Sequence, residues 1–122
     1  MWFEMSLVEI SSKEEFFRAV KSNDVVIIEY YNQNSVESKK FSRVVKQLSR
    51  YADPRILFLR INIGKNPDLG EGVNEIPCIR VYYKGKMIFE QKGSFGREDL
   101  DLFVLRRSIR SVFYGFNIAF KI

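Results

Sequence analysis

The sequence predicts an α/β fold in which a central mixed sheet has helices on both faces. Two segments, residues 25–31 and 56–62, are nearly continuous apolar runs, which is typical of strands buried on both faces. Amphipathic helical patterns lie before, between and after these runs. Near the end of the chain, two short strand patterns flank Lys84-Gly85-Lys86, which indicates an antiparallel hairpin.

Local signals set the bounds of the elements. Ser12 and Glu15 have the spacing of a capping box, which satisfies free backbone N–H groups at the start of a helix. Pro54 lies beyond the end of the second helix. In order, the predicted elements are a strand at 7–10, a helix from 12 to a turn at 23–24, a strand at 25–31, a helix at 36–51, a strand at 56–62, a short helical segment at 67–73, strands at 79–83 and 87–91, and a helix from about 96 past 110.

Length and composition fit one domain over residues 1–122, with a C-terminal extension at 111–122. Apolar residues make up 46% of the chain and charged residues 29%, which is an ordinary globular balance. No apolar run approaches the ~20 residues that a membrane-spanning helix needs. The first residues lack the basic and apolar regions of a signal peptide. We therefore expect a cytoplasmic protein that makes no membrane contact.

Two counts exclude whole classes of chemistry. The chain has no His and one Cys. It therefore has no Ser–His or Cys–His nucleophile pair, no Cys/His zinc site and no intramolecular disulfide. We expect no cofactor and no metal, and we favour a binding protein over an enzyme.

Several motifs together resemble the thioredoxin family over residues 7–105. The run 25–31 resembles the family's central strand, and Ile76-Pro77 stands where the family keeps an Ile–cis-Pro pair. Lys84-Gly85-Lys86 matches the turn of its last hairpin, and Gly93 matches the glycine that follows. The resemblance implies a thioredoxin-like three-layer sandwich. It also places Ser35-Val36-Glu37-Ser38 where the family carries its redox Cys-x-x-Cys motif.

The serines at these positions favour a structural interpretation. A serine hydroxyl cannot form the thiolate and disulfide of thiol exchange. Ser35 is a good helix N-cap, and Glu37 suits the positive end of a helix. The alternative is a catalytic serine, which we disfavour because the chain has no His to activate it.

Cys78 directly follows Pro77 and has two interpretations. In the thioredoxin fold this position lies near the redox motif, so a thiol there could be reactive. Free cysteines, however, are among the most buried residues, and Glu37 places negative charge near the same helix end. We favour a buried structural Cys78.

The resemblance also implies a binding groove that needs no cysteine. In the family, backbone beside the cis-proline pairs with extended peptides, so Ile76 and Pro77 could retain a peptide-binding surface. Tyr31 and Asn34 lead into the serine loop, where polar and aromatic residues suit binding. Turn chemistry explains Asn34 equally well.

Two charged residues match the family's buried acid and its basic neighbour. These are Glu29, in the central strand, and Arg60, in the next strand. Because no thiol pair is present to receive a proton, we expect a structural ion pair, since an unpaired buried carboxylate is costly.

Basic residues form a stripe on the second predicted helix. Lys39, Arg43, Lys46 and Arg50 stand at helical spacing, and Arg106, Arg107 and Arg110 form a second basic group. The net charge of +5 permits a polyanion such as nucleic acid as partner. A solvated helix face is the favoured interpretation, because no nucleic-acid motif accompanies the charge.

The extension at 111–122 is the one departure from the family. Phe116, Ile118, Phe120 and Ile122 alternate with other residues, which predicts a strand. Such an apolar tail would either form a homodimer or fold back over its own domain, against Trp2 and Phe3, and the sequence leaves both alternatives open.

The leading functional hypothesis is a non-redox thioredoxin-like protein that binds a protein or peptide partner at the Ser35–Ser38 loop and the Pro77 groove. One alternative is a thiol-redox protein that uses Cys78. The other is a nucleic-acid or polyanion binder that uses the basic stripe.

Overall fold

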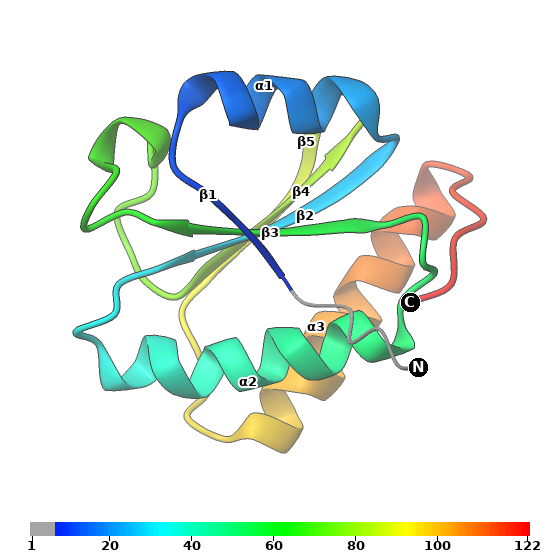
Figure 1. The fold of residues 1–122 in the computed structure, drawn as a ribbon. Helices are drawn as coiled ribbons and strands as arrows, with labels where there is room; N and C mark the ends of the chain where they lie inside the picture. Colours follow the sequence, from blue (N-terminus) through cyan, green and yellow to red (C-terminus); the bar gives the residue numbers. More distant parts are fainter. Residues whose placement is uncertain (1–6) are drawn as a thin grey trace, which may run out of the picture.

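A computed structural model describes residues 7–122, which form three layers with a five-stranded sheet in the middle. The sheet confirms the predicted α/β class, because β3 runs parallel to β1 and β2 whereas β4 is antiparallel to β2 and β5. Helix α1 covers one face, and α2 and α3 cover the other (Figure 1). In sheet order the strands are β1 (Val8–Ile10), β3 (Leu57–Asn62), β2 (Val25–Tyr31), β4 (Cys78–Tyr83) and β5 (Lys86–Lys92); the helices are α1 (Lys13–Ser22), α2 (Val36–Tyr51) and α3 (Glu98–Gly115).

Strand β2 lies at the centre of the sheet and supplies both halves of the core. Its residues from Val25 to Tyr30 are all buried. Val25 and Ile27 pack in the core under α2 and α3, whereas Val26 and Ile28 pack in the core under α1. The continuous apolar run in the sequence therefore corresponds to a strand covered on both faces.

Helix α1 begins as the capping pattern predicts. The Ser12 side chain accepts a hydrogen bond from the backbone N–H of Glu15, at 3.1 Å. The Glu15 carboxylate accepts the backbone N–H of Ser11, at 3.0 Å, one residue earlier than in the standard capping box. These bonds fix the entry of the chain onto the α1 face of the sheet.

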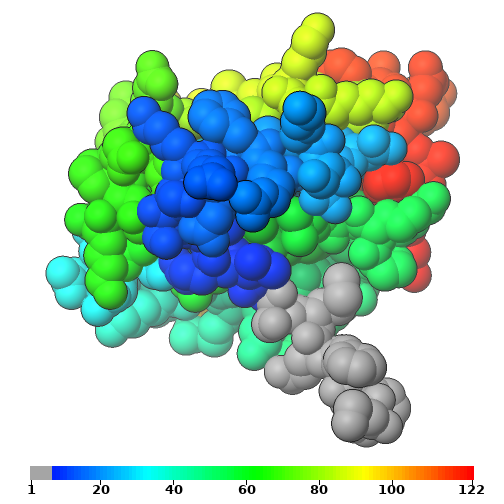
Figure 2. All heavy atoms as spheres, turned by 45° about the horizontal axis from the view of Figure 1, so that its top comes forward, coloured from blue at the N-terminus to red at the C-terminus, as the bar shows by residue number. Residues whose placement is uncertain are grey.

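The segment expected to be helical over residues 67–73 is shorter in the structure. It forms one 3-10 turn, η1 (Pro67–Leu69), and then an irregular loop in which Gly72 has a positive φ of 77°. Figure 2 shows this green segment beside the blue side chains of α1. Because so short a turn covers little surface, α1 is the main cover of this face.

The tail differs from its predicted conformation. Helix α3 continues to Gly115, and Asn117 then adopts a positive φ of 57°, which reverses the chain. The backbone N–H of Ile118 donates to the carbonyl of Phe113. The backbone carbonyl of Lys121 accepts a hydrogen bond from the backbone N–H of Asp53, at 2.7 Å. No strand forms over residues 116–122.

The alternation of apolar residues in the tail has a different cause from the one we expected. Ile118 and Ile122 are both buried in the core under α2 and α3. The prediction of a strand is therefore wrong, and the tail folds back over its own domain. Trp2 and Phe3, its suggested partners, lie outside the described residues, and a homodimer stays a prediction.

Replacement of Ile118 by Ala should destabilise the domain. The change removes buried methyl groups, so we expect a loss of about 2 kcal/mol in the free energy of unfolding, the low end of the range for such sites. Urea denaturation measures it. Tyr114→Ala is the control, because Tyr114 is 87% exposed, and it should change stability by less than about 0.5 kcal/mol. Equal effects of the two variants would contradict the docked tail.

Candidate functional site

Three loops meet at the end of the sheet where β2 and β3 finish, at the left of Figure 1. The first loop joins β2 to α2 and contains Ser35. The second approaches β4 and contains Ile76 and Pro77. The third joins β5 to α3 and contains Gly93. The predicted binding residues of the first two loops thus lie at one end of the molecule.

The two serines of the first loop are engaged with the backbone. Ser35 is the N-cap of α2, and its side chain accepts the backbone N–H of Ser38, at 3.2 Å. Ser38 is itself buried, and its hydroxyl accepts the backbone N–H of Asn32, at 3.3 Å. Both side chains therefore stabilise the turn into the helix, which is the structural role that the sequence favours.

The other predicted residues of this loop differ in accessibility. Val36 is 67% exposed, and Asn34 and Glu37 are also exposed. Tyr31 is half-buried. Its hydroxyl donates to the carboxylate of Glu9, at 2.8 Å, and its ring stacks on the guanidinium of Arg60. The loop therefore offers Val36 and its neighbours for contact, whereas Tyr31 is already held by the domain.

The peptide bond between Ile76 and Pro77 is cis. Pro77 is buried, and its carbonyl accepts the backbone N–H of Gly93, at 2.7 Å. Gly93 has a φ of 81°, a left-handed backbone conformation that favours glycine. Ile76 is half-buried and precedes β4, whose pairing with β2 begins at Cys78.

The third loop adds residues that the sequence did not indicate as functional. Phe95 is 58% exposed although its loop is rigidly held. The buried Asp101 of α3 accepts the backbone N–H of Phe95, at 2.8 Å, and the Ser94 hydroxyl, at 2.6 Å. An apolar residue in a segment bounded by Gly93 and Gly96 is the signal that could have identified it.

A hollow of about 290 Å³ lies between the first turn of α2 and the third loop. Phe95 forms part of its wall, and Glu37 and Lys40 contribute from α2. The complete lining is Glu37, Lys40, Ser94, Phe95, Gly96, Glu98 and Asp101. It is the size of a side-chain subsite, near the lower limit for small-ligand pockets.

Comparison with known proteins identifies the family. The family profile described as Thioredoxin matches residues 7–106. The chain belongs to the thioredoxin family. A search of curated protein sequences gives no match.

Solved thioredoxins share this member's fold at low sequence identity. Mitochondrial thioredoxin 3 of Saccharomyces cerevisiae is 20% identical, with a TM-score of 0.73, over 88% of this chain and 97% of the other. A mutant thioredoxin of Halobacterium salinarum is 18% identical, with a TM-score of 0.70, over 88% and 94%. The thioredoxin of Malassezia sympodialis is 19% identical, with a TM-score of 0.72, over 87% and 90%. These likenesses establish the fold.

Cys78, the one thiol of this thioredoxin-family chain, is buried. It belongs to the core on the α1 face, whereas α2 and its serines cover the opposite face. Burial, and next the negative charge of Glu90, raise the pKa of the thiol to about 11, so the thiolate is scarce at neutral pH. The structure therefore does not bring Cys78 together with the Ser35 loop in a reactive arrangement.

Glu29 and Arg60 are brought together in the interior. Arg60 Nε donates to Glu29 Oε1 at 3.1 Å, and the Ser42 hydroxyl donates to the other carboxylate oxygen. Burial disfavours the charged form and raises the pKa of Glu29, although the hydrogen bonds from Ser42 and Arg60 act in the opposite direction. A raised pKa means that Glu29 favours folding most below about pH 4.5 and loses that contribution as the pH rises through its folded pKa.

The predicted basic stripe lies on the exposed side of α2, as Lys39, Arg43, Lys46 and Arg50 are all exposed. Arg43 makes a bidentate pair with Glu98 of α3, at 3.1 and 3.0 Å. This contact raises the pKa of Arg43 and lowers that of Glu98. One charge of the stripe is therefore already paired between the two helices.

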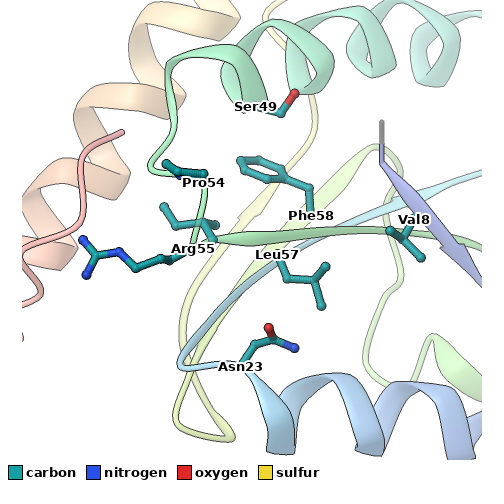
Figure 3. A pocket seen from close by; sticks show the side chains of 8 residues that line it. Val8, Asn23, Ser49, Pro54, Arg55, Leu57 and Phe58 are labelled. Carbon is teal, nitrogen blue, oxygen red and sulfur yellow. The ribbon is translucent and has the colours of Figure 1, made fainter. Parts of the chain in front are cut away.

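A hollow of about 230 Å³ lies at the β1–β3 edge, and Arg55 is the one charged residue in its lining (Figure 3). Arg55 is already paired with Asp53, at 2.6 Å. Within residues 7–122, no cluster of three or more Cys, Asp or Glu side chains could hold a metal. No helix of this part of the chain is long and apolar enough to span a membrane.

A double-mutant cycle should show coupling between Glu29 and Arg60. Glu29→Leu alone removes the buried carboxylate that Arg60 contacts at 3.1 Å and leaves the guanidinium with the more distant Glu9, at 4.0 Å. It should therefore cost about 2 kcal/mol more than Glu29→Leu combined with Arg60→Met. Urea denaturation at pH 7 of the four proteins measures the difference. Additive effects would show that the contact carries no coupling energy.

Native Cys78 should resist thiol reagents. At pH 8 the folded protein should react with a disulfide reagent at least about a hundredfold more slowly than the urea-unfolded protein, because the thiol is buried and its pKa is raised to about 11. The rate of absorbance change measures the reaction. Equal rates in the two states would restore Cys78 as a candidate reactive thiol.

Proposed function

We propose that this thioredoxin-family domain binds an extended segment of a protein partner at the Ser35 end and performs no thiol–disulfide exchange. The observation that carries the proposal is the exposure of Val36 and Phe95 beside the hollow between α2 and the β5–α3 loop. Exposed apolar side chains next to a concave surface are typical of binding sites. A cytoplasmic location is part of the proposal and suits a chain with one cysteine.

The arrangement of the backbone also supports a peptide ligand. Ile76 lies outside the β4 ladder, so its backbone groups are placed where an extended chain could pair with them. Phe95 is fixed by the two hydrogen bonds that Asp101 accepts from its loop. A preformed site of this kind loses little conformational entropy on binding.

The chemistry of the site argues against redox activity. Ser35 and Ser38 cannot form a disulfide, and their hydroxyls are engaged with backbone N–H groups. Cys78 is buried on the other side of the sheet. What remains at this end of the domain is a contact surface.

Selection of peptides from a random-sequence display library tests the proposal. Selected peptides should bind the full chain, and Val36→Asp or Phe95→Asp should weaken their binding at least about tenfold, since each places a charge in an apolar contact. Fluorescence polarisation measures affinity. Phe17→Asp is the control: Phe17 is 61% exposed, but on α1.

Two results would contradict the proposal. One is a selection in which no peptide depends on Val36 or Phe95. The other is reduction of insulin disulfides by the purified protein, at a rate that disappears in Cys78→Ala. The second result would establish the one-cysteine alternative instead.

A further inference from the structure

The C-terminal part of the chain combines positive charge with aromatic residues. From Leu102 to Ile122 it contains Arg106, Arg107, Arg110 and Lys121 but no Asp or Glu. The same stretch contains five aromatic residues. The acidic residues of α3, Glu98, Asp99 and Asp101, are all in its first turn. A segment with this imbalance attracts anionic partners.

One side of α3 presents these residues to solvent. Phe103, Arg107, Arg110 and Tyr114 stand at i, i+4, i+7 and i+11, so they form a stripe along the helix. Phe103 is 59% exposed, Tyr114 is 87% exposed, and both arginines are exposed. Arg107 makes no ion pair with any residue in 7–122, and Arg110 donates through Nε to the Ile122 backbone oxygen, at 3.1 Å. Two arginines thus lie between two aromatic side chains on one accessible face.

The stripe continues onto the β4–β5 turn. Phe116 is 49% exposed, and its ring lies 6.3 Å from the ring of Tyr83. Lys84 Nζ in turn lies 5.3 Å from the Tyr83 ring. Figure 2 shows the red C-terminal residues gathered beside the yellow-green hairpin. We call this surface the C-terminal patch: Phe103, Arg107, Arg110, Tyr114, Phe116 and Lys84.

The patch is separate from the proposed peptide site. In Figure 1 the end of α3 lies at the right, whereas the loop between β2 and α2 lies at the left. None of the six patch residues lines the hollow beside Phe95. An inference about the patch is therefore independent of the proposed function.

We infer that the C-terminal patch binds single-stranded nucleic acid. Arginine and lysine side chains neutralise phosphates, and exposed aromatic rings stack on unpaired bases, which explains both residue types on one surface. Phe103 and Tyr114 are about 16 Å apart along the helix axis, so the stripe matches a strand of several nucleotides. An anionic membrane would instead favour apolar side chains gathered apart from the charges, whereas here the two arginines lie between the aromatic side chains.

Anisotropy of a fluorescein-labelled 12-nucleotide oligouridylate, titrated with the full chain, tests the inference. With three cations in the patch, the slope of log K against log salt should be about −2, at about 0.7 per phosphate contact. Arg107→Glu with Arg110→Glu should weaken binding at least tenfold and flatten the slope to about −0.7. Tyr114→Ala should weaken binding at least about fivefold but leave the slope unchanged, because it removes stacking and not charge.

Lys39→Glu with Lys46→Glu is the matched control. It makes the same change in net charge on the exposed side of α2, and it should alter affinity by less than about threefold. The substituted residues are all exposed, so circular dichroism should show folded variants.

Four outcomes would overturn the inference. The first is an absence of binding to the oligonucleotide, and the second is an equal loss in the α2 control. The third is a Tyr114→Ala variant with unchanged affinity. The fourth is retention of the protein on phosphatidylserine vesicles, lost in the arginine variant, without oligonucleotide binding, which would assign the patch to a membrane surface.

Discussion

Burial of β2 on both faces is the constraint on which the rest of the structure depends. This strand pairs with β3 on one side and β4 on the other, and its side chains enter both cores. A carboxylate within it, at Glu29, must therefore find partners inside the domain, and Arg60 and Ser42 supply them. The end of the same strand fixes where the Ser35 loop and α2 begin. The position of the candidate site at the Ser35 loop is therefore set by β2, the central buried strand.

Hydrogen bonds to the backbone determine the local structure at the Ser35 end of the domain. The hydroxyls of Ser35 and Ser38 accept backbone N–H groups, so the turn into α2 is held by hydrogen bonds. Cys78 lies in the core of the other face, where its high pKa keeps it protonated. The cysteine and the serines therefore serve packing and capping. In the proposed function, the exposed apolar residues Val36 and Phe95 make the contacts with the partner.

Much of the fold could be predicted from the sequence, whereas the path of the tail and the role of Phe95 could not. The apolar run at 25–31 and the capping pattern at Ser12 are local signals, and both elements form where they predict. The strand predicted for the tail does not form, because the alternation from Phe116 to Ile122 describes the spacing of apolar residues and not the direction of the chain. A positive φ at Asn117 turns the chain back, so that Ile118 and Ile122 enter the core. The sequence did not indicate Phe95, because the residue that holds its backbone, Asp101, lies on a helix that only the fold brings close to it.

Chemical-shift mapping by NMR shows whether the Ser35 end binds a peptide without using the thiol. A peptide selected for binding would be titrated into the ¹⁵N-labelled protein and into its Cys78→Ala variant. We expect the amide shifts to concentrate at Val36, Ile76 and Phe95 and to be the same in both proteins, because Cys78 packs on the opposite side of the sheet. Shifts that centre elsewhere, or that vanish in the Cys78→Ala variant while it remains folded, would contradict this expectation.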